Sequence, residues 1–300
     1  MPVLKYLPSA IALAWMAVTP ALADDLFAAP PSDGWYNNLL SEPRLPARAP
    51  AKYADWRGLY AGGQVSYSDG FADFSGSTIA PISYALRETD LESTFAPSGW
   101  PVLGSANHGG VGGGGFVGYN FEYLTPDMNV VLGFEANFDI ASLSIFSPEA
   151  PIGRSLPTDS SGNTYLVNIT GGGQVSNLDW STLRGRVGWG IGNFLPYAFI
   201  GLAVGNANVN IVENISGEVN PPSSGPCRST STPACSTFSF SGTAGKDSTW
   251  LYGMTAGVGL DIAVSRNFFV RTEYEYVQFQ PVSGVNIDVN TVRLGGGVRF

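Results

Sequence analysis

The final eleven residues, from Asn290 to Phe300, alternate strictly between two kinds of side chain. One side comprises Val292, Leu294, Gly296, Val298 and Phe300, and the other comprises Thr291, Arg293, Gly295, Gly297 and Arg299. An extended strand points successive residues to opposite faces, so this segment predicts a strand with one apolar and one polar face. The segment also closes on an aromatic residue, which is typical of the last strand of a bacterial outer-membrane barrel.

The composition favours a membrane barrel over a soluble domain or a helical membrane protein. Only 13% of the residues are charged, whereas about 25% is usual in soluble domains. Glycine is abundant at 38 residues, and there are 17 Phe, 13 Tyr and 7 Trp. No internal run approaches the ~20 consecutive apolar residues that a membrane helix needs. A barrel instead spreads its apolar residues over alternate positions, which agrees with a mean hydropathy of only +0.08.

The N-terminal residues resemble an export signal. Lys5 precedes an apolar stretch at 10–18, and the residues from Ala21 to Ala23 form a small-residue cleavage site. We therefore expect residues 1–23 to be a signal peptide cleaved between Ala23 and Asp24, with a buried N-terminal helix as the alternative. Residues 24–55 are rich in proline and are interpreted as a periplasmic arm, and residues 56–300 as the barrel domain. The net charge of −9 argues against nucleic acid as a partner.

Eight segments of alternating polarity follow the arm. They lie near 59–67, 109–123, 129–140, 180–190, 196–204, 249–264, 268–277 and 290–300. Short turns at 124–127, 191–194 and 265–267 alternate with long, Ser/Thr/Asn/Gly/Pro-rich connections at about 68–106, 141–178 and 207–247. This asymmetry predicts an all-β fold, an eight-stranded antiparallel transmembrane barrel with short periplasmic turns and long extracellular loops. A soluble lipocalin-type barrel is the alternative, although its loops would be short.

The faces opposite the apolar residues carry charges of both signs and are expected to line the barrel interior. These residues are Glu122, Glu135, Asp139, Arg184, Arg186, Asp261, Arg271, Glu273, Glu275, Arg293 and Arg299. Buried charges must pair or be hydrated, and eight strands enclose a lumen just wide enough for side chains. We therefore expect an ion-paired plug, with an ion pathway as the alternative.

Other residue patterns bear on the surface and on chemistry. An aromatic belt facing lipid is expected from Tyr123, Trp189, Trp250, Tyr252, Tyr274, Tyr276 and Phe300, and also from Trp180 if its register agrees. Cys227 and Cys235 share one loop, where an exported protein favours a disulfide over a metal pair. The single histidine, His108, is expected in a solvated loop. No catalytic, cofactor-binding or metal-binding pattern is present in the sequence.

Three segments carry a family resemblance. Residues 55–63 (DWRGLYAGG), 271–276 (RTEYEY) and 290–300 (NTVRLGGGVRF) resemble the opening and closing strands of small alphaproteobacterial outer-membrane barrels of the porin-like, OmpA-transmembrane-domain/opacity superfamily. The resemblance covers about 55–300 in layout but is sharp only in these segments. It implies an eight-stranded barrel inserted by the outer-membrane assembly machinery, which reads the C-terminal aromatic strand at Phe300. The Pro-rich arm and the cysteine-bearing loop depart from the pattern.

These observations predict an integral, non-enzymatic outer-membrane protein with a structural or surface-interaction role. A small-solute porin is the main alternative, followed by binding of a surface ligand such as haem, or adhesion. The expected partners are outer-membrane lipid and lipopolysaccharide, the barrel assembly machinery and an extracellular ligand of the loops.

Overall fold

The computed structural model describes residues 54–77, 79–124, 129–141, 143–221 and 236–300. The predicted signal peptide, its cleavage site at Ala23 and Asp24, nearly all of the arm, and both Cys227 and Cys235 lie outside the described residues. Only residues 54 and 55 of the arm are described. Ala54 donates a backbone hydrogen bond of 3.1 Å to the carbonyl of Gly192, in the turn between two strands.

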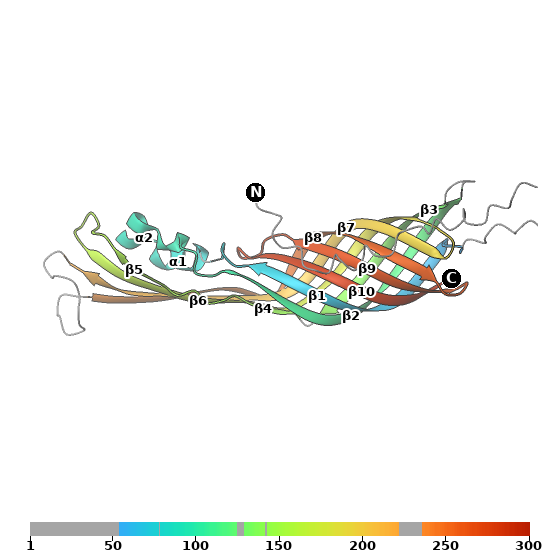
Figure 1. The fold of residues 1–300 in the computed structure, drawn as a ribbon. Coiled ribbons are helices and arrows are strands. Elements are labelled where there is room, and N and C mark those ends of the chain that lie inside the picture. The colour runs from blue at the N-terminus through green and yellow to red at the C-terminus, as the bar shows by residue number, and fades with distance from the viewer. Residues whose placement is uncertain (1–53, 78, 125–128, 142, 222–235) are drawn as a thin grey trace, which may run out of the picture. The chain divides into compact units, whose positions relative to one another are not determined.

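Within the described residues, eight long strands close into a ring (Figure 1). They are β1 (Gly58–Asp73), β2 (Ser105–Leu124), β3 (Asn129–Ala141), β6 (Thr164–Trp189), β7 (Phe194–Asn220), β8 (Ser236–Ala263), β9 (Phe268–Phe279) and β10 (Asn286–Arg299). Every pairing is antiparallel, and the ring closes where β1 pairs with β10 and β3 pairs with β6. Two short strands, β4 (Ser144–Phe146) and β5 (Ile152–Leu156), pair with β6 outside the ring. The predicted antiparallel barrel is confirmed.

The apolar side chains change face partway along β9 and β10. On β10, Val292 and Leu294 are exposed on the outer face, whereas Ile287 and Val289 are fully buried. Residues 287 and 289 have the opposite parity to 292 and 294, and the β1–β10 register runs through without a shift. Hydrocarbon surrounds a membrane barrel, but water surrounds any part that projects beyond the bilayer, so apolar residues there must point inward. The level of this change therefore marks the extracellular surface of the membrane.

The long connections predicted at 68–106, 141–178 and 207–247 contain regular secondary structure among their described residues, which the sequence did not predict. β6, β7 and β8 continue as paired strands far beyond the level where polarity changes. The connection between β1 and β2 forms α1 (Ile79–Leu86), α2 (Asp90–Phe95) and the 3-10 turn η2 (Pro97–Gly99). Figure 1 shows α1, α2 and β5 beside the outer ends of these strands, away from the C-terminus.

These elements share a hydrophobic core of their own, and we call them the extracellular lobe. Its buried residues are Ile82, Leu86, Leu91, Trp100, Val102, Leu156, Tyr165, Val167, Ile169 and Ile215. Thr89 caps α2, because its side chain accepts a hydrogen bond of 3.3 Å from the backbone amide of Glu92. No helix among the described residues is long and apolar enough to cross a membrane.

Candidate functional site

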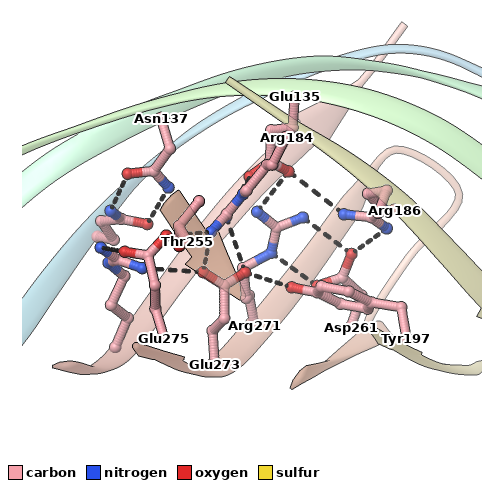
Figure 2. Close-up of polar contacts among 12 residues, drawn as sticks. Glu135, Asn137, Arg184, Arg186, Tyr197, Thr255, Asp261, Arg271, Glu273 and Glu275 are labelled. Atoms are coloured by element: carbon pink, nitrogen blue, oxygen red, sulfur yellow. Dashed lines mark hydrogen bonds and ion pairs between the residues drawn. The ribbon is translucent and has the colours of Figure 1, made fainter. Parts of the chain in front are cut away.

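The barrel interior brings nine of the eleven predicted lumen residues into one buried network, which we call the ion layer. It contains Glu135, Asp139, Arg184, Arg186, Asp261, Arg271, Glu273, Glu275 and Arg293. They project from β3, β6, β8, β9 and β10, so the network spans the lumen (Figure 2). Every side chain in it is at most 2% exposed.

Glu135 joins three guanidinium groups at one end of the ion layer. Its carboxylate pairs with Arg184, with Arg271 at 2.8 Å and with Arg186 at 3.3 Å. Asp261 ties two of these cations together, because Arg271 reaches it through two nitrogens at 2.7 and 3.0 Å and Arg186 approaches at 2.8 Å. Two-pronged contacts of this kind fix the orientation of both planar groups.

Arg293 holds the other end of the ion layer. Its guanidinium lies 2.6 Å from Asp139 and 3.1 Å from Glu273, and it also pairs with Glu275. Arg184 links the two ends, since it contacts Glu273 at 2.7 Å and Glu275 at 3.2 Å. The charges therefore form one connected lattice rather than separate pairs.

Neutral polar side chains add hydrogen bonds to the same carboxylates. Tyr60 donates to Glu135 and Tyr197 donates to Glu273, each at 2.7 Å, and Thr255 donates to Glu275 at 2.8 Å. The amide of Gln64 donates to both oxygens of Asp139 at 3.1 and 3.2 Å. Sequence reasoning assigned only charges to the network, although all four of these residues fall on the inward face of their strands.

An aromatic layer covers the periplasmic side of the ion layer. It comprises Trp56, Tyr60, Phe116, Tyr197, Phe199 and Phe269. Arginine planes stack on these rings, with Arg184 lying 4.1 Å from the centroid of Phe199 and Arg271 lying 4.1 Å from that of Phe116. Such stacking holds a cation that has lost its water.

An apolar layer covers the extracellular side of the ion layer. Its buried members include Leu178, Trp180, Leu251, Val277, Phe279 and Val289. Strand β9 crosses all three layers in order, from Phe269 through Arg271, Glu273 and Glu275 to Val277 and Phe279. The apolar layer was not predicted from the sequence.

Two predicted members lie outside the ion layer, and the expectation for them was wrong. Arg299 donates to backbone carbonyls, those of Asp55, Ser265 and Arg266, the last two at 3.1 and 3.0 Å. Glu122 accepts hydrogen bonds from the amide of Trp56 at 3.1 Å and from the side chain of Asn129 at 2.6 Å. Both residues lie at the periplasmic end of the barrel, where free backbone groups compete for side chains.

The residues expected in the aromatic belt form two groups on the outer face. Trp250, Tyr252, Tyr274 and Tyr276 lie near the extracellular change of polarity, whereas Tyr123, Trp189 and Phe300 lie at the opposite ends of their strands. Trp180 does not belong to either group. It has the same parity as Arg184 and is buried in the apolar layer.

The single histidine lies in a different element from the one predicted. His108 is exposed but lies on β2, paired with Gly70 of β1, rather than in a loop. The described residues hold no group of three or more His, Cys, Asp or Glu side chains arranged to bind a metal ion.

Curated proteins of related sequence are outer-membrane proteins. The chain is 24% identical to the 31 kDa outer-membrane immunogenic protein of Brucella melitensis, over 87% of this chain and 91% of that protein. It is 27% identical to the 22 kDa outer membrane protein of Rhizobium leguminosarum bv. viciae, over 44% of this chain. The match spans 53%, about half, of that Rhizobium protein.

Two solved structures and one domain family also match this chain. Neisserial surface protein A matches with a TM-score of 0.32 at 13% identity, over 81% of this chain and 97% of that one. Ail of Yersinia pestis matches with a TM-score of 0.28 at 15% identity, over 81% and 99%. Residues 45–300 match the family described as "Outer membrane protein beta-barrel domain". Because this match covers well over half of the chain, the protein belongs to the outer-membrane protein beta-barrel family.

Proposed function

We propose that this outer-membrane protein is a sealed barrel that anchors the extracellular lobe and acts through surface interaction rather than transport. The supporting observation is the stacking of three side-chain layers across one lumen. The ion layer fills the middle of the barrel, and it lies between the aromatic layer and the apolar layer. An ion crossing the barrel would have to separate paired charges and also enter an apolar region, both of which are unfavourable.

The proposed role is non-enzymatic. Among the described residues, His108 lies on β2 opposite Gly70 and makes no side-chain hydrogen bond or ion pair with a serine, cysteine or carboxylate, as a general base would require. The carboxylates of the ion layer are held by arginines and shielded on both sides, so no substrate reaches them without opening the barrel. The folded lobe, in contrast, presents its strands and helices to the outside.

Conductance across planar bilayers tests the sealed barrel. We expect the refolded full-length protein to show no stable opening on the nanosiemens scale, because the lumen holds no continuous aqueous path. The same preparation must first show the heat-dependent shift in gel mobility typical of a folded barrel. A stable open pore in that preparation would favour the alternative, a small-solute channel, and would refute the proposal.

The lobe provides the second half of the test. A variant in which residues 79–99 are replaced by a short Gly/Ser linker leaves the membrane strands and the ion layer intact. Under the proposal, this variant keeps the heat-dependent mobility shift and the closed lumen. It should, however, lose the binding to whole cells that the intact protein shows. Equal binding by both proteins would show that the lobe does not carry the function.

A further inference from the structure

The membrane-facing wall carries a groove, and the strand register shows at which depth of the bilayer this groove lies. The groove has a volume of about 690 Å³ and runs across β2, β3, β6 and β7. Its sides are apolar residues of the outer face, chiefly Phe134 of β3 and Ile200 of β7. It opens on the outer face of the barrel, and its lining also includes two residues that face the lumen, Arg186 of the ion layer and Phe199 of the aromatic layer.

The groove exists because one side chain is missing from an apolar row. Gly185 of β6 lies directly between Phe134 and Ile200 in register. These neighbours are 66% and 63% exposed, so they stand out from the wall on either side of the glycine. A Cβ atom built on Gly185 would meet nothing closer than the carbonyl oxygen of Ile200 at 4.0 Å. The hollow is therefore open space that no side chain of the barrel fills.

The groove lies in the periplasmic half of the membrane. Tyr123 lines the groove at this end. Trp189 does not line the groove, but it is four residues from Gly185 on β6 and is paired, like Tyr123, with Val130 of β3. Four residues of strand extend about 13 Å, which is about 10 Å of depth at a strand tilt of about 40°. Because the apolar band of such barrels is about 25 Å tall, the groove opens towards the periplasmic interface, where aromatic residues meet lipid headgroups.

We propose that this groove binds one acyl chain of a phospholipid from the periplasmic leaflet. A flexible hydrocarbon chain fits a mainly apolar hollow that is continuous with the lipid-facing wall. Tyr123 and Trp189 would lie beside the glycerol and headgroup of the same lipid, where a phenol hydroxyl and an indole N–H can donate hydrogen bonds. Lipid bound in this way would exchange more slowly than lipid on the remainder of the wall.

Photo-crosslinking with a phospholipid that carries a diazirine in its acyl chain tests the site. The full-length protein is reconstituted in vesicles of this lipid, irradiated and mapped by mass spectrometry. We expect adducts at Phe134 and Ile200 to exceed those at Leu294 on β10, an equally exposed lipid-facing residue, by at least threefold. Equal labelling at the groove residues and at Leu294 would show that the groove is occupied only by freely exchanging bulk lipid, and would overturn the proposal.

The depth of labelling tests the choice of leaflet. A diazirine near the headgroup should label residues around Tyr123, and one near the middle of the chain should label residues around Phe134. The reverse order would mean that a chain enters from the extracellular side, which contradicts the proposed source. Covalent dimers in place of lipid adducts would identify a second copy of the chain as the occupant and would also contradict it.

Gly185→Leu gives a specific control of the groove. The open space at Gly185 accepts a leucine, so we expect a folded barrel that loses most of the excess labelling at Ile200. Gly296→Leu is the matched variant, because Gly296 also faces lipid and its added Cβ would be 3.6 Å from the nearest atom, the carbonyl oxygen of Phe269. It should leave labelling at the groove unchanged. The main test compares labelling at Phe134 and Ile200 with labelling at Leu294 in the wild-type protein, so it does not depend on whether either variant folds.

Discussion

Arg293 and Glu273 lie directly opposite each other on β10 and β9, and their charged groups approach to 3.1 Å inside the closed barrel. Each is shared with other partners, Arg293 with Asp139 and Glu273 with Arg184. The pair therefore connects the seam between the last two strands to the far wall of the lumen.

Removing either partner should destabilise the folded barrel. Arg293→Met and Glu273→Gln each leave a buried opposite charge short of a partner, which typically costs about 3–5 kcal/mol. We expect both variants to lose the compact, heat-dependent gel band at a lower temperature than the wild type. Arg57→Met, at an exposed position, is the control and should not change this temperature. If neither lumen variant differs from the wild type, the ion layer is not structural.

Much of the membrane-embedded part could be predicted because one rule governs it. A strand that faces lipid on one side places every second residue in the lumen, so the charged positions on β9, Arg271, Glu273 and Glu275, identify the interior directly. The same alternation of inward and outward residues predicted the lumen positions on the other strands, and the pairing of β10 with β9 agrees with it. The hydrogen-bond partners of charged residues at the barrel ends were not predictable. Arg299 donates to the backbone carbonyls of Ser265 and Arg266, and the sequence does not show which backbone carbonyls are free to accept a hydrogen bond.

The part beyond the membrane was missed for a physical reason. There the apolar residues occupy the inward positions, as at Ile287 and Val289, so a search for apolar residues on one fixed face finds no strand. The sequence does contain this switch of the apolar residues from one set of alternate positions to the other, for example between Val289 and Val292. The helices of the lobe carry a weaker signal, since helices this short depend on packing against the sheet rather than on their own propensity.

Crowding at Gly259 should make an alanine there destabilising. A Cβ on this inward-facing glycine of β8 would lie 2.3 Å from Cζ of Tyr197, whose hydroxyl donates to Glu273. Displacing the ring would break that hydrogen bond and the stacking of Arg186 on Tyr197 at 4.1 Å. We expect Gly259→Ala to lower the free energy of unfolding by about 1–3 kcal/mol in urea titrations. Gly185→Ala, with open space around it, should be nearly neutral, and equal effects would contradict the packing of Tyr197.

Glu213 should make the part of the sheet beyond the membrane sensitive to pH. Its side chain is 1% exposed, lies between Gly171 and Gly242 in register, and neither carboxylate oxygen has a hydrogen-bond partner among the described residues. Burial raises the pKa of Glu213 to about 7 from its usual 4.5. Below pH 4.5 the carboxyl is neutral whether the strands are packed or open, so it carries no penalty. Stability is lost as the pH rises from 4.5 to 7, and the loss is complete above that range.

The expected loss is about 1–3 kcal/mol between pH 4.5 and pH 8. Limited proteolysis of the folded protein at several pH values, normalised to cleavage of an unfolded substrate, should show faster cutting within β6–β8 at pH 8. Glu213→Gln should remove most of this pH dependence and slow the cutting at pH 8. Glu218→Gln, further along the same strand and partly exposed, should retain the wild-type profile. An unchanged profile in Glu213→Gln would refute the assignment to Glu213.

Phe300 should matter for insertion of the barrel more than for its stability. Its side chain is 75% exposed, while its backbone amide donates a hydrogen bond of 2.9 Å to the carbonyl of Leu59. Phe300→Ala keeps that backbone bond and removes only the aromatic ring, so the purified, refolded barrel should unfold like the wild type. If the assembly machinery reads the terminal aromatic residue, the amount of folded protein in the outer membrane of expressing cells should fall several-fold. Phe268→Ala removes a ring of 58% exposure from the start of β9, and an equal fall in that variant would assign the effect to the lipid-facing aromatic residues in general instead of to the terminal one.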